Sequence, residues 1–260
     1  MAAPEEFQGT GAPIDAGGFT AACTAIGVSA PEIWAVLSVE TSGCGFLPDR
    51  RPKILFERHY FSHLTDHEYD TSHPDISQPI PGGYGLPGAH QYDRLAEAIA
   101  LDRLAALQSA SWGLGQVMGS NCRKAGFAGI EEMVAAMVLS ESAQLGAMVS
   151  FVKSNGIDQQ LRAHDWAGFA SRYNGRSYAS HNYDGQLQHF FQLYSAAVTP
   201  DLRVRAAQIY LTYRGISPGG IDGILGTNTL TAVKQFQRLI DVTPTGIIDD
   251  GLLGQLSKPL

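Results

Sequence analysis

The stretch from Ser29 to Phe61, SAPEIWAVLSVETSGCGFLPDRRPKILFERHYF, predicts a short helix, a glycine-rich turn and then a strand. Ser29 and Glu32 have the spacing of a capping box, in which two residues satisfy each other's free backbone N–H groups. Pro31 is tolerated in the first turn because its missing N–H would have no helical partner there. We therefore expect a helix to begin beside Ser29.

Glu40 falls in the last turn of this helix, on its apolar face. It completes an i, i+3, i+4, i+7 pattern with three apolar residues, Ile33, Val36 and Leu37. Burial and the negative end of the helix dipole both disfavour an ionised carboxylate there, so both raise its pKa. A carboxyl of this kind keeps a proton near neutral pH, as a general acid must. The alternative is an ion pair with Arg50 or Arg51, and the spacing alone favours neither interpretation.

The composition bounds the possible partners. The chain has 260 residues, enough for one large or two modest domains, and its net charge of −7 gives a nucleic-acid partner no electrostatic support. The N-terminal residues lack the basic and apolar regions of a secretory signal, so we expect synthesis in the cytoplasm without a signal peptide. The apolar run from Met133 to Val152 is interrupted by polar residues, which favours a core helix over stable membrane insertion.

Cysteines and histidines give no support for a metal or a thiol nucleophile. The cysteines are Cys23, Cys44 and Cys122, which we expect to be free and mostly buried thiols. Cys44 follows Glu40 in the turn, but the sequence suggests no histidine that would activate it. A helix would align three histidines, His59, His63 and His67. No cysteine or carboxylate pattern completes a zinc motif with them, so we expect no metal and no cofactor.

The remaining organisation follows from periodicity and turn residues. Residues 1 to 12 are expected to form a flexible lead. Further helices are expected over 15–27, 91–108, 130–153, 157–171 and 182–197. Between Lys53 and Glu57 we expect a strand, with Ile54 and Phe56 on one face and Lys53, Leu55 and Glu57 on the other. The Pro/Gly-rich loop over 70–90 is either a wall of a cleft or a surface excursion.

Two further segments suit the wall of a ligand site. SWGLGQVMG at 111–119 is broken by glycines and carries Trp112 and Gln116. RYNG at 172–175 is a turn that carries Tyr173 and Asn174. Glycines allow a ligand to approach the backbone, and the aromatic and amide groups suit contacts with a polar ring. The alternative is core and turn chemistry, which applies to Trp112 above all.

The C-terminal segment is expected to be a separate small unit. Thr199 and Pro200 mark a boundary, and GIDGILG at 220–226 is echoed by TGIIDDG at 245–251. Each turn is followed by a helix-like stretch, which indicates a three-helix unit with two similar turns. A unit of this size buries a limited core, so it favours binding over catalysis.

The pattern D-G-x-x-G-x-x-T-x-x-A-V-x-x-F-Q runs from Asp222 to Gln237, and Thr245 and Gly246 begin the second turn. With these residues, the segment from about 202 to 256 resembles the peptidoglycan-binding module appended to many cell-wall hydrolases. The resemblance implies a module that docks on bacterial peptidoglycan. Its matched glycines would allow tight turns and its matched apolar residues would fill the core, so they do not identify the ligand contacts.

Four segments of the preceding region carry a second resemblance: VETSGCGF at 39–46, RPKILFERH at 51–59, SWGLGQVMG at 111–119 and RYNG at 172–175. With them, residues from about 14 to 197 resemble the N-acetylmuramidase domain of bacteriophage endolysins. The last two segments are also similar to goose-type lysozymes and soluble lytic transglycosylases. In those enzymes the glutamate that ends the first long helix is the general acid, which maps onto Glu40.

The resemblance implies cleavage of the β-1,4 bond between N-acetylmuramic acid and N-acetylglucosamine, with Glu40 protonating the leaving oxygen. Glu57 is our candidate for a second carboxylate, Asp49 is a weaker one, and an arginine pair is the alternative for Glu57. A carboxyl separation of about 5–5.5 Å implies retention, and about 6.5–9.5 Å implies inversion through water. Without a second carboxylate, attack by the muramic-acid 6-hydroxyl would make the protein a lytic transglycosylase.

We expect sugar contacts from four residues: Trp112, Gln116, Tyr173 and Asn174. The predicted architecture is mainly α, with an α+β lysozyme-like catalytic domain that contains a small β-hairpin (1–198) and a three-helix peptidoglycan-binding domain (201–260). The resemblance also implies a monomeric endolysin that is released to the cell wall and lyses its bacterial host. The other functional class is a non-catalytic peptidoglycan-binding phage structural protein.

Overall fold

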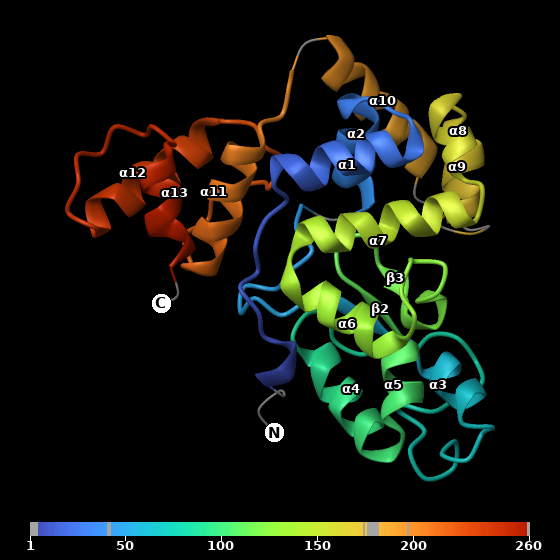
Figure 1. Cartoon of the computed structure of the whole chain (residues 1–260). Coiled ribbons are helices and arrows are strands. Elements are labelled where there is room, and N and C mark those ends of the chain that lie inside the picture. Colours follow the sequence, from blue (N-terminus) through green and yellow to red (C-terminus); the bar gives the residue numbers. More distant parts are fainter. Residues whose placement is uncertain (1–4, 41–42, 174, 176–181, 197, 259–260) are drawn as a thin grey trace. The chain divides into compact units, whose positions relative to one another are not determined.

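The computed structural model describes residues 5–40, 43–173, 175, 182–196 and 198–258. Within these residues the chain forms thirteen α-helices, two short 3₁₀ helices and one three-stranded sheet (Figure 1). The predicted mainly α class with a small antiparallel sheet is confirmed. The chain divides into two compact units, one made of Met1–Gly11 and Gly45–Asn155 and the other of Ala12–Cys44 and Gly156–Leu260.

The first unit contains the sheet and the helices that cover it. Its elements are η1 (Glu5–Phe7), β1 (Ile54–Phe56), α3 (Arg58–Leu64), α4 (His90–Leu101), α5 (Arg103–Gln108), β2 (Ala110–Trp112), β3 (Val117–Met118), η2 (Gly119–Asn121), α6 (Ile130–Leu139) and α7 (Glu141–Ser154). The strands are antiparallel in the order β1-β2-β3. Leu55 pairs with Ser111, which pairs with Met118. Ile54 and Phe56 are buried and Leu55 is half-buried, which confirms the predicted alternation.

Two helices that we predicted as continuous are each divided by a polar residue. Asp102 leaves the helical conformation after α4 and accepts a hydrogen bond from Ala105 N, so it begins α5. Ser140 does the same between α6 and α7, where its hydroxyl accepts from Ala143 N. Both are good N-cap residues, and the capping bond compensates for the interrupted backbone ladder. The predicted helices over 91–108 and 130–153 were therefore correct in extent and wrong in continuity.

The N-terminal segment is not the flexible lead that we expected, from residue 5 onward. Phe7 is buried, and its ring lies 5.5 Å from the Tyr92 ring and 5.8 Å from the Trp112 ring. Glu6 also pairs with Arg103 at 3.0 Å. A single aromatic residue, Phe7, anchors the segment to the core. Phe7 belongs to no periodic apolar pattern, so the sequence did not predict this contact.

Among the residues described, the regular elements of the second unit are all helices. Its elements are α1 (Ala16–Ile26), α2 (Ala30–Glu40), α8 (Asp158–Arg162), α9 (Trp166–Tyr173), α10 (Tyr183–Ala196), α11 (Leu202–Tyr213), α12 (Thr227–Leu239) and α13 (Asp250–Ser257). α2 packs along α10, and α9 packs beside α10 (Figure 1). The predicted helix over 157–171 is divided at His164, which has a left-handed φ of 54°.

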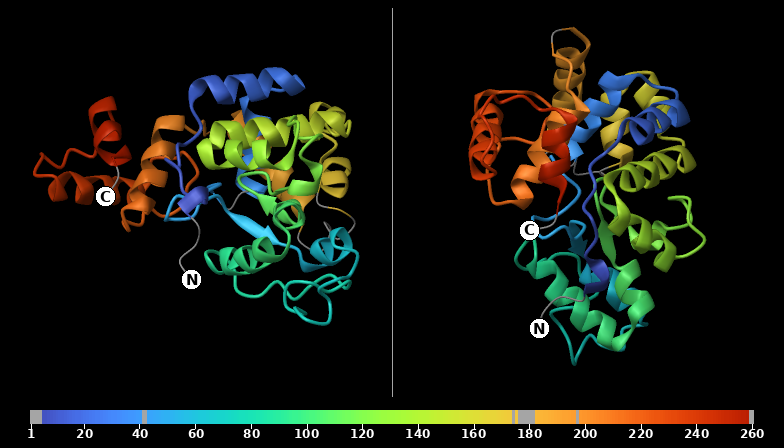
Figure 2. Two further views of the ribbon diagram at one scale, coloured as in Figure 1. Left: turned by 60° about the horizontal axis from the view of Figure 1, so that its bottom comes forward. Right: turned by 60° about the vertical axis from the view of Figure 1, so that its left-hand side comes forward.

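The last three helices, coloured orange to red in Figure 2, follow one another at the C-terminal end of the chain. They share one apolar core, as predicted. Its fully buried members include Ala207, Leu211, Val233, Phe236 and Leu256. They come from all three helices, so each helix buries one face against the other two. The predicted domain boundary between 198 and 201 remains a prediction.

Among the residues described, no single helix is long and apolar enough to cross a membrane; α1 and α2 reach the length together, across a bend of 103°. Cys44 and Cys122 are buried thiols and Cys23 is half-buried.

Candidate active site

One half of the predicted capping box is found at the beginning of α2, the contact from the Glu32 carboxylate back to Ser29. Glu32 Oε2 accepts from Ser29 N at 3.1 Å and from the Ser29 hydroxyl at 2.6 Å. Its other oxygen lies 2.8 Å from His164 Nε2. Burial opposes ionisation of Glu32, but the hydrogen bonds from Ser29 and His164 outweigh it and lower the pKa of this carboxyl. The cap therefore also ties α2 to the turn between α8 and α9.

Glu40 is the last residue of α2, as predicted. Ile33, Val36 and Leu37, which share its face, are at most 3% exposed, so the apolar stripe is a core face. The side chain of Glu40 lies outside the part of the chain that the structure describes. Its place at the end of a helix whose neighbouring face is buried follows from the backbone and from these three residues.

Each of the two arginines that we considered as partners for Glu40 has a partner within the first unit, and their pairing with Glu40 lies outside the described residues. The Arg51 guanidinium donates to Asp49 Oδ2 at 2.7 and 2.9 Å, and it lies over the Tyr92 ring. Arg50 donates to the Thr10 carbonyl at 3.3 Å. Asp49, our weaker candidate for the second carboxylate, is thus held in an ion pair with Arg51.

Glu57 lies immediately after β1, and its side chain is 16% exposed. Its Oε2 approaches His59 Nδ1 at 3.2 Å, but the approach is not aligned as a hydrogen bond, and neither atom has another partner among the residues described. Burial raises the pKa of the Glu57 carboxyl. Burial, and then the charges of Arg58 and His63, lower the pKa of the His59 imidazole. A half-buried carboxylate whose desolvation is offset by few hydrogen bonds or opposite charges is typical of functional sites.

The Pro/Gly-rich loop runs close to Glu57. The charge of Glu57 contributes, after burial, to a raised pKa of Tyr84 in this loop. Gln91 connects the loop to the strand, because its Oε1 accepts from Phe56 N at 2.9 Å while its Nε2 donates to the carbonyls of Tyr84 and Leu86 at 2.7 Å. The loop is therefore positioned beside the carboxylate by a side chain that is 1% exposed.

Gln116 lies in the turn between β2 and β3, and its side chain contacts Ser111, which pairs with Leu55 on the half-buried face of the sheet. Gln116 has a left-handed φ of 46°, which is strained for a residue with a side chain. Its Oε1 accepts from the Ser111 hydroxyl at 2.9 Å, and its Nε2 donates to the carbonyls of Gly113 and Lys53 at 2.8 and 3.2 Å. Gln116 is nevertheless exposed. The Gln116 amide thus contacts the backbone just before β1, whereas the candidate carboxylate follows β1.

Trp112 lies on the opposite, buried face of the sheet. It is 0% exposed, and its indole N–H donates to the Leu107 carbonyl at 3.0 Å. A sugar has no access to this ring, so the structure assigns Trp112 to the core rather than to the sugar-binding surface. The physical reason is the strand period of two, since Trp112 pairs with Ile54 on the buried face.

Tyr173 is the last residue of α9, half-buried and stacked on Phe169 with ring centroids 5.5 Å apart. Asn174 lies outside the residues described. Of the predicted site residues, Glu57, Trp112 and Gln116 belong to the first unit, and Glu40 and Tyr173 belong to the second.

Sequence reasoning missed the polar residues that hold these elements. His59 was considered only as one of three aligned histidines, yet its Nδ1 lies 3.2 Å from Glu57 Oε2. Gln91 and the fully buried Glu141, which accepts from Gly45 N at 2.8 Å, have no motif of their own. Among the residues described, no three His, Cys, Asp or Glu side chains gather as a metal site.

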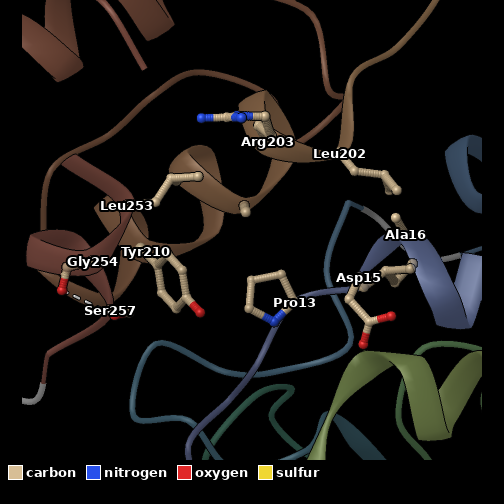
Figure 3. Close-up of a pocket in the computed structure, with 11 residues that line it drawn as sticks. Pro13, Asp15, Ala16, Leu202, Arg203, Tyr210, Leu253, Gly254 and Ser257 are labelled. Atoms are coloured by element: carbon tan, nitrogen blue, oxygen red, sulfur yellow. Dashed lines mark hydrogen bonds between the residues drawn. The ribbon is translucent and has the colours of Figure 1, made fainter. Parts of the chain in front are cut away.

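A groove of about 390 Å³ lies within the second unit (Figure 3). One side is formed by residues 13–16, at the beginning of α1, and the other by residues of α11 and α13 such as Arg203, Tyr210 and Leu253. Its lining is mostly apolar. α11 and α13 therefore face the segment that leads into α1.

Comparisons with known proteins assign the chain to a family. A model of the N-acetylmuramidase family matches residues 29–195, and a model of a peptidoglycan-binding domain matches residues 201–256. The first match covers more than half of the chain, so the protein belongs to the N-acetylmuramidase family. It combines a muramidase domain with a C-terminal peptidoglycan-binding domain.

Among solved structures, the chain is similar to the crystal structure of the Burkholderia AP3 phage endolysin. The two share 37% sequence identity and superpose with a TM-score of 0.66 over 70% of each chain. No curated protein matches the chain.

Proposed function

We propose that this protein is an endolysin that hydrolyses the β-1,4 bond between N-acetylmuramic acid and N-acetylglucosamine and thereby lyses a bacterial host. The observation that carries the proposal is the family match over 29–195, which spans the helix ending at Glu40 and both glycine-rich segments. The similarity to a phage endolysin supports it. The catalytic region is residues 1–198, and residues 201–260 dock on the wall.

In the proposed mechanism Glu40 is the general acid. It donates its proton to the glycosidic oxygen as the bond from that oxygen to the muramic-acid C1 breaks. The sugar passes through an oxocarbenium-like transition state, and the Glu57 carboxylate either stabilises it or activates the attacking water. If Glu57 stabilises the cation, Glu40 takes the proton lost by the attacking water and is ready for another cycle. If Glu57 activates the water, Glu57 takes that proton, and exchange with solvent then ionises Glu57 and returns a proton to Glu40.

The surroundings of Glu57 support its role. It must be ionised to stabilise a cation or accept a proton, and burial raises its pKa. Activity should therefore fall on the acid side at a pH above the usual range of a glutamate, because protonation removes the carboxylate. The side chain of Gln116 contacts the half-buried face of the sheet and would bind sugar hydroxyl and acetamido groups with Tyr173 and Asn174, while Trp112 supports the sheet from its buried side.

The test is a mass analysis of the sugars released from purified peptidoglycan by four proteins: the wild type, Glu40→Gln, Glu57→Gln and Glu68→Gln. Glu68 is an exposed glutamate outside the site and serves as the matched control. Glu40→Gln should lower kcat about 10²- to 10⁴-fold, the usual contribution of a general acid, and still bind walls. Glu57→Gln should cost about 10²-fold and remove the acid limb of the pH profile.

Reducing-end muramic acid in the wild-type products supports hydrolysis. A product one water lighter, with a 1,6-anhydro ring, means instead that the 6-hydroxyl attacked C1 and that the protein is a lytic transglycosylase. Near-normal activity of Glu40→Gln removes the general-acid assignment. Absence of any cleaved sugar favours a wall-binding structural protein.

A further inference from the structure

Arg205 is a buried arginine in the peptidoglycan-binding domain. It lies within α11 and is only 2% exposed, although arginine is almost never fully buried unless it has partners. Its Nη2 donates to the carbonyl oxygen of Gly43 at 2.8 Å. Gly43 belongs to the turn that follows α2, three residues beyond Glu40, and both residues belong to the same compact unit. A side chain of the binding domain therefore holds the turn next to the proposed general acid.

A second residue of the binding domain closes on the same turn. Gly43 has a left-handed φ of 92°, and a Cβ at this position would lie 2.9 Å from Ile221 Cβ. The contact thus requires glycine both for its backbone conformation and for its lack of a side chain. The space between Leu37, Ser38, Gly43, Arg205 and Ile221 is almost filled, with a remaining volume of only about 10 Å³.

The loop that carries Ile221 is itself rigidly held. Gln208, also in α11 and 1% exposed, accepts from Asp222 N at 3.0 Å and from Gly223 N at 2.9 Å. Its Nε2 donates to Asp222 Oδ1 at 2.9 Å and to Thr229 Oγ1 at 3.1 Å. α11 therefore fixes both contacts with the turn, one directly through Arg205 and one through the loop.

We propose that Arg205 is a positioning residue for Glu40, so that the peptidoglycan-binding domain is part of the catalytic apparatus as well as a wall anchor. The inference rests on the proposed function of Glu40. A guanidinium at the C-terminal end of α2 is electrostatically favourable there, because the helix dipole is negative at that end. Its hydrogen bond fixes the carbonyl group of Gly43, three residues beyond Glu40. Misplacement of a catalytic group by about 1 Å costs about 10²-fold in rate, so this restraint acts on kcat.

The experiment uses the full chain and short, soluble, peptide-free glycan strands of alternating N-acetylglucosamine and N-acetylmuramic acid. Docking on an insoluble wall contributes nothing to cleavage of this substrate, so any effect is separate from wall targeting. The variants are Arg205→Met, which keeps the apolar stem, Arg205→Lys, which keeps the charge and a donor, and Arg203→Met as the control. Arg203 lies on the same helix but is half-exposed and pairs with Asp250 at 2.7 Å.

We expect Arg205→Met to lower kcat about 10- to 100-fold with little change in KM, and Arg205→Lys to be intermediate. Arg203→Met should resemble the wild type. All assays run well below each Tm, and a wall sedimentation assay checks that the binding domain is folded. A merely structural arginine would change Tm and leave the kcat of the folded protein unaltered.

Wild-type kcat in folded Arg205→Met overturns the inference. If Arg205→Met does not fold, Arg205→Lys decides in the same way, and wild-type kcat in that variant overturns it. The proposed function fails separately, through an inactive wild type or an active Glu40→Gln, and the inference then fails with it. An active wild type, an inactive Glu40→Gln and a fully active Arg205→Met refute the positioning role alone.

Discussion

The two similar turns of the peptidoglycan-binding domain share a pattern of hydrogen bonds, but their surroundings differ. In the first, Gln208 Oε1 accepts from Gly223 N at 2.9 Å, and in the second, Gln237 Oε1 accepts from Gly246 N at 2.8 Å. The two glycines have left-handed φ angles of 76° and 79°. The residue before each glycine, Asp222 or Thr245, accepts a hydrogen bond from the backbone two residues on.

The two turns differ in the burial of the isoleucine near each glycine. Ile221, beside the first turn, is half-buried against Gly43, whereas Ile247 in the second turn is 62% exposed. A repeated local motif was therefore folded twice in the same way, and one copy gained a contact with the turn that follows Glu40. The scaffold role therefore belongs to both turns, and the proposed positioning role belongs only to the first.

The largest expected effect comes from removing the buried amide of each turn. Gln208→Leu leaves two buried backbone N–H groups, of Asp222 and Gly223, without an acceptor and should cost about 2–6 kcal/mol of unfolding free energy. Gln237→Leu leaves one such group, of Gly246, and should cost about 1–3 kcal/mol. Urea unfolding of the full chain measures both values. Equal losses would show that the additional hydrogen bond from Asp222 N to Gln208 contributes nothing to stability.

A smaller effect is expected from the two isoleucines. Ile221→Ala should lower kcat on soluble glycan strands several-fold, because it loosens the contact with Gly43, and should destabilise the protein by about 1 kcal/mol. Ile247→Ala should leave kcat unchanged and alter stability by less than about 0.5 kcal/mol, as is usual at exposed positions. Parallel kinetic and thermal measurements compare the pair. A matching loss of kcat in Ile247→Ala would contradict the special role of the first turn.

The smallest effect is expected at Asp250, which follows the second turn and pairs with Arg203 across the surface. Asp250→Asn should reduce the unfolding free energy by less than about 1 kcal/mol, because both side chains are well exposed to water. The loss should shrink further at high salt, where exposed charges are screened. A series of urea titrations at increasing ionic strength makes the measurement. A large loss of unfolding free energy that persists at high salt would mean that the ion pair between Asp250 and Arg203 contributes more to stability than an exposed pair should.

Much of the local structure was predictable because its causes are local. The cap formed by Ser29 and Glu32, the end of α2 at Glu40 and the alternation along β1 depend on residues a few positions apart. The divisions at Asp102 and Ser140 are local as well, and we overlooked them because apolar periodicity continues across each capping residue.

Less of the candidate site was predictable. The sequence suggested that Glu57 shares a sheet face with Lys53 and Leu55, but the approach of His59 to its carboxylate depends on where β1 ends and α3 begins. Trp112 was suggested as a sugar contact. In the structure it pairs with Ile54, and its side chain is buried in the core. Side chains alternate between the two faces of a strand, and the packing of the sheet against the rest of the unit decides which face is buried.

By itself, the sequence determined the helical class, the helix that ends at Glu40 and the two glycine turns, because helix caps, periodicity and φ > 0 positions act over a few residues. Only the tertiary structure decided that Phe7 belongs to the core, that Trp112 is inaccessible and that Arg205 reaches Gly43. Burial is a property of the folded chain: the bond between Arg205 and Gly43 joins residues 162 positions apart, and no local pattern encodes such a contact.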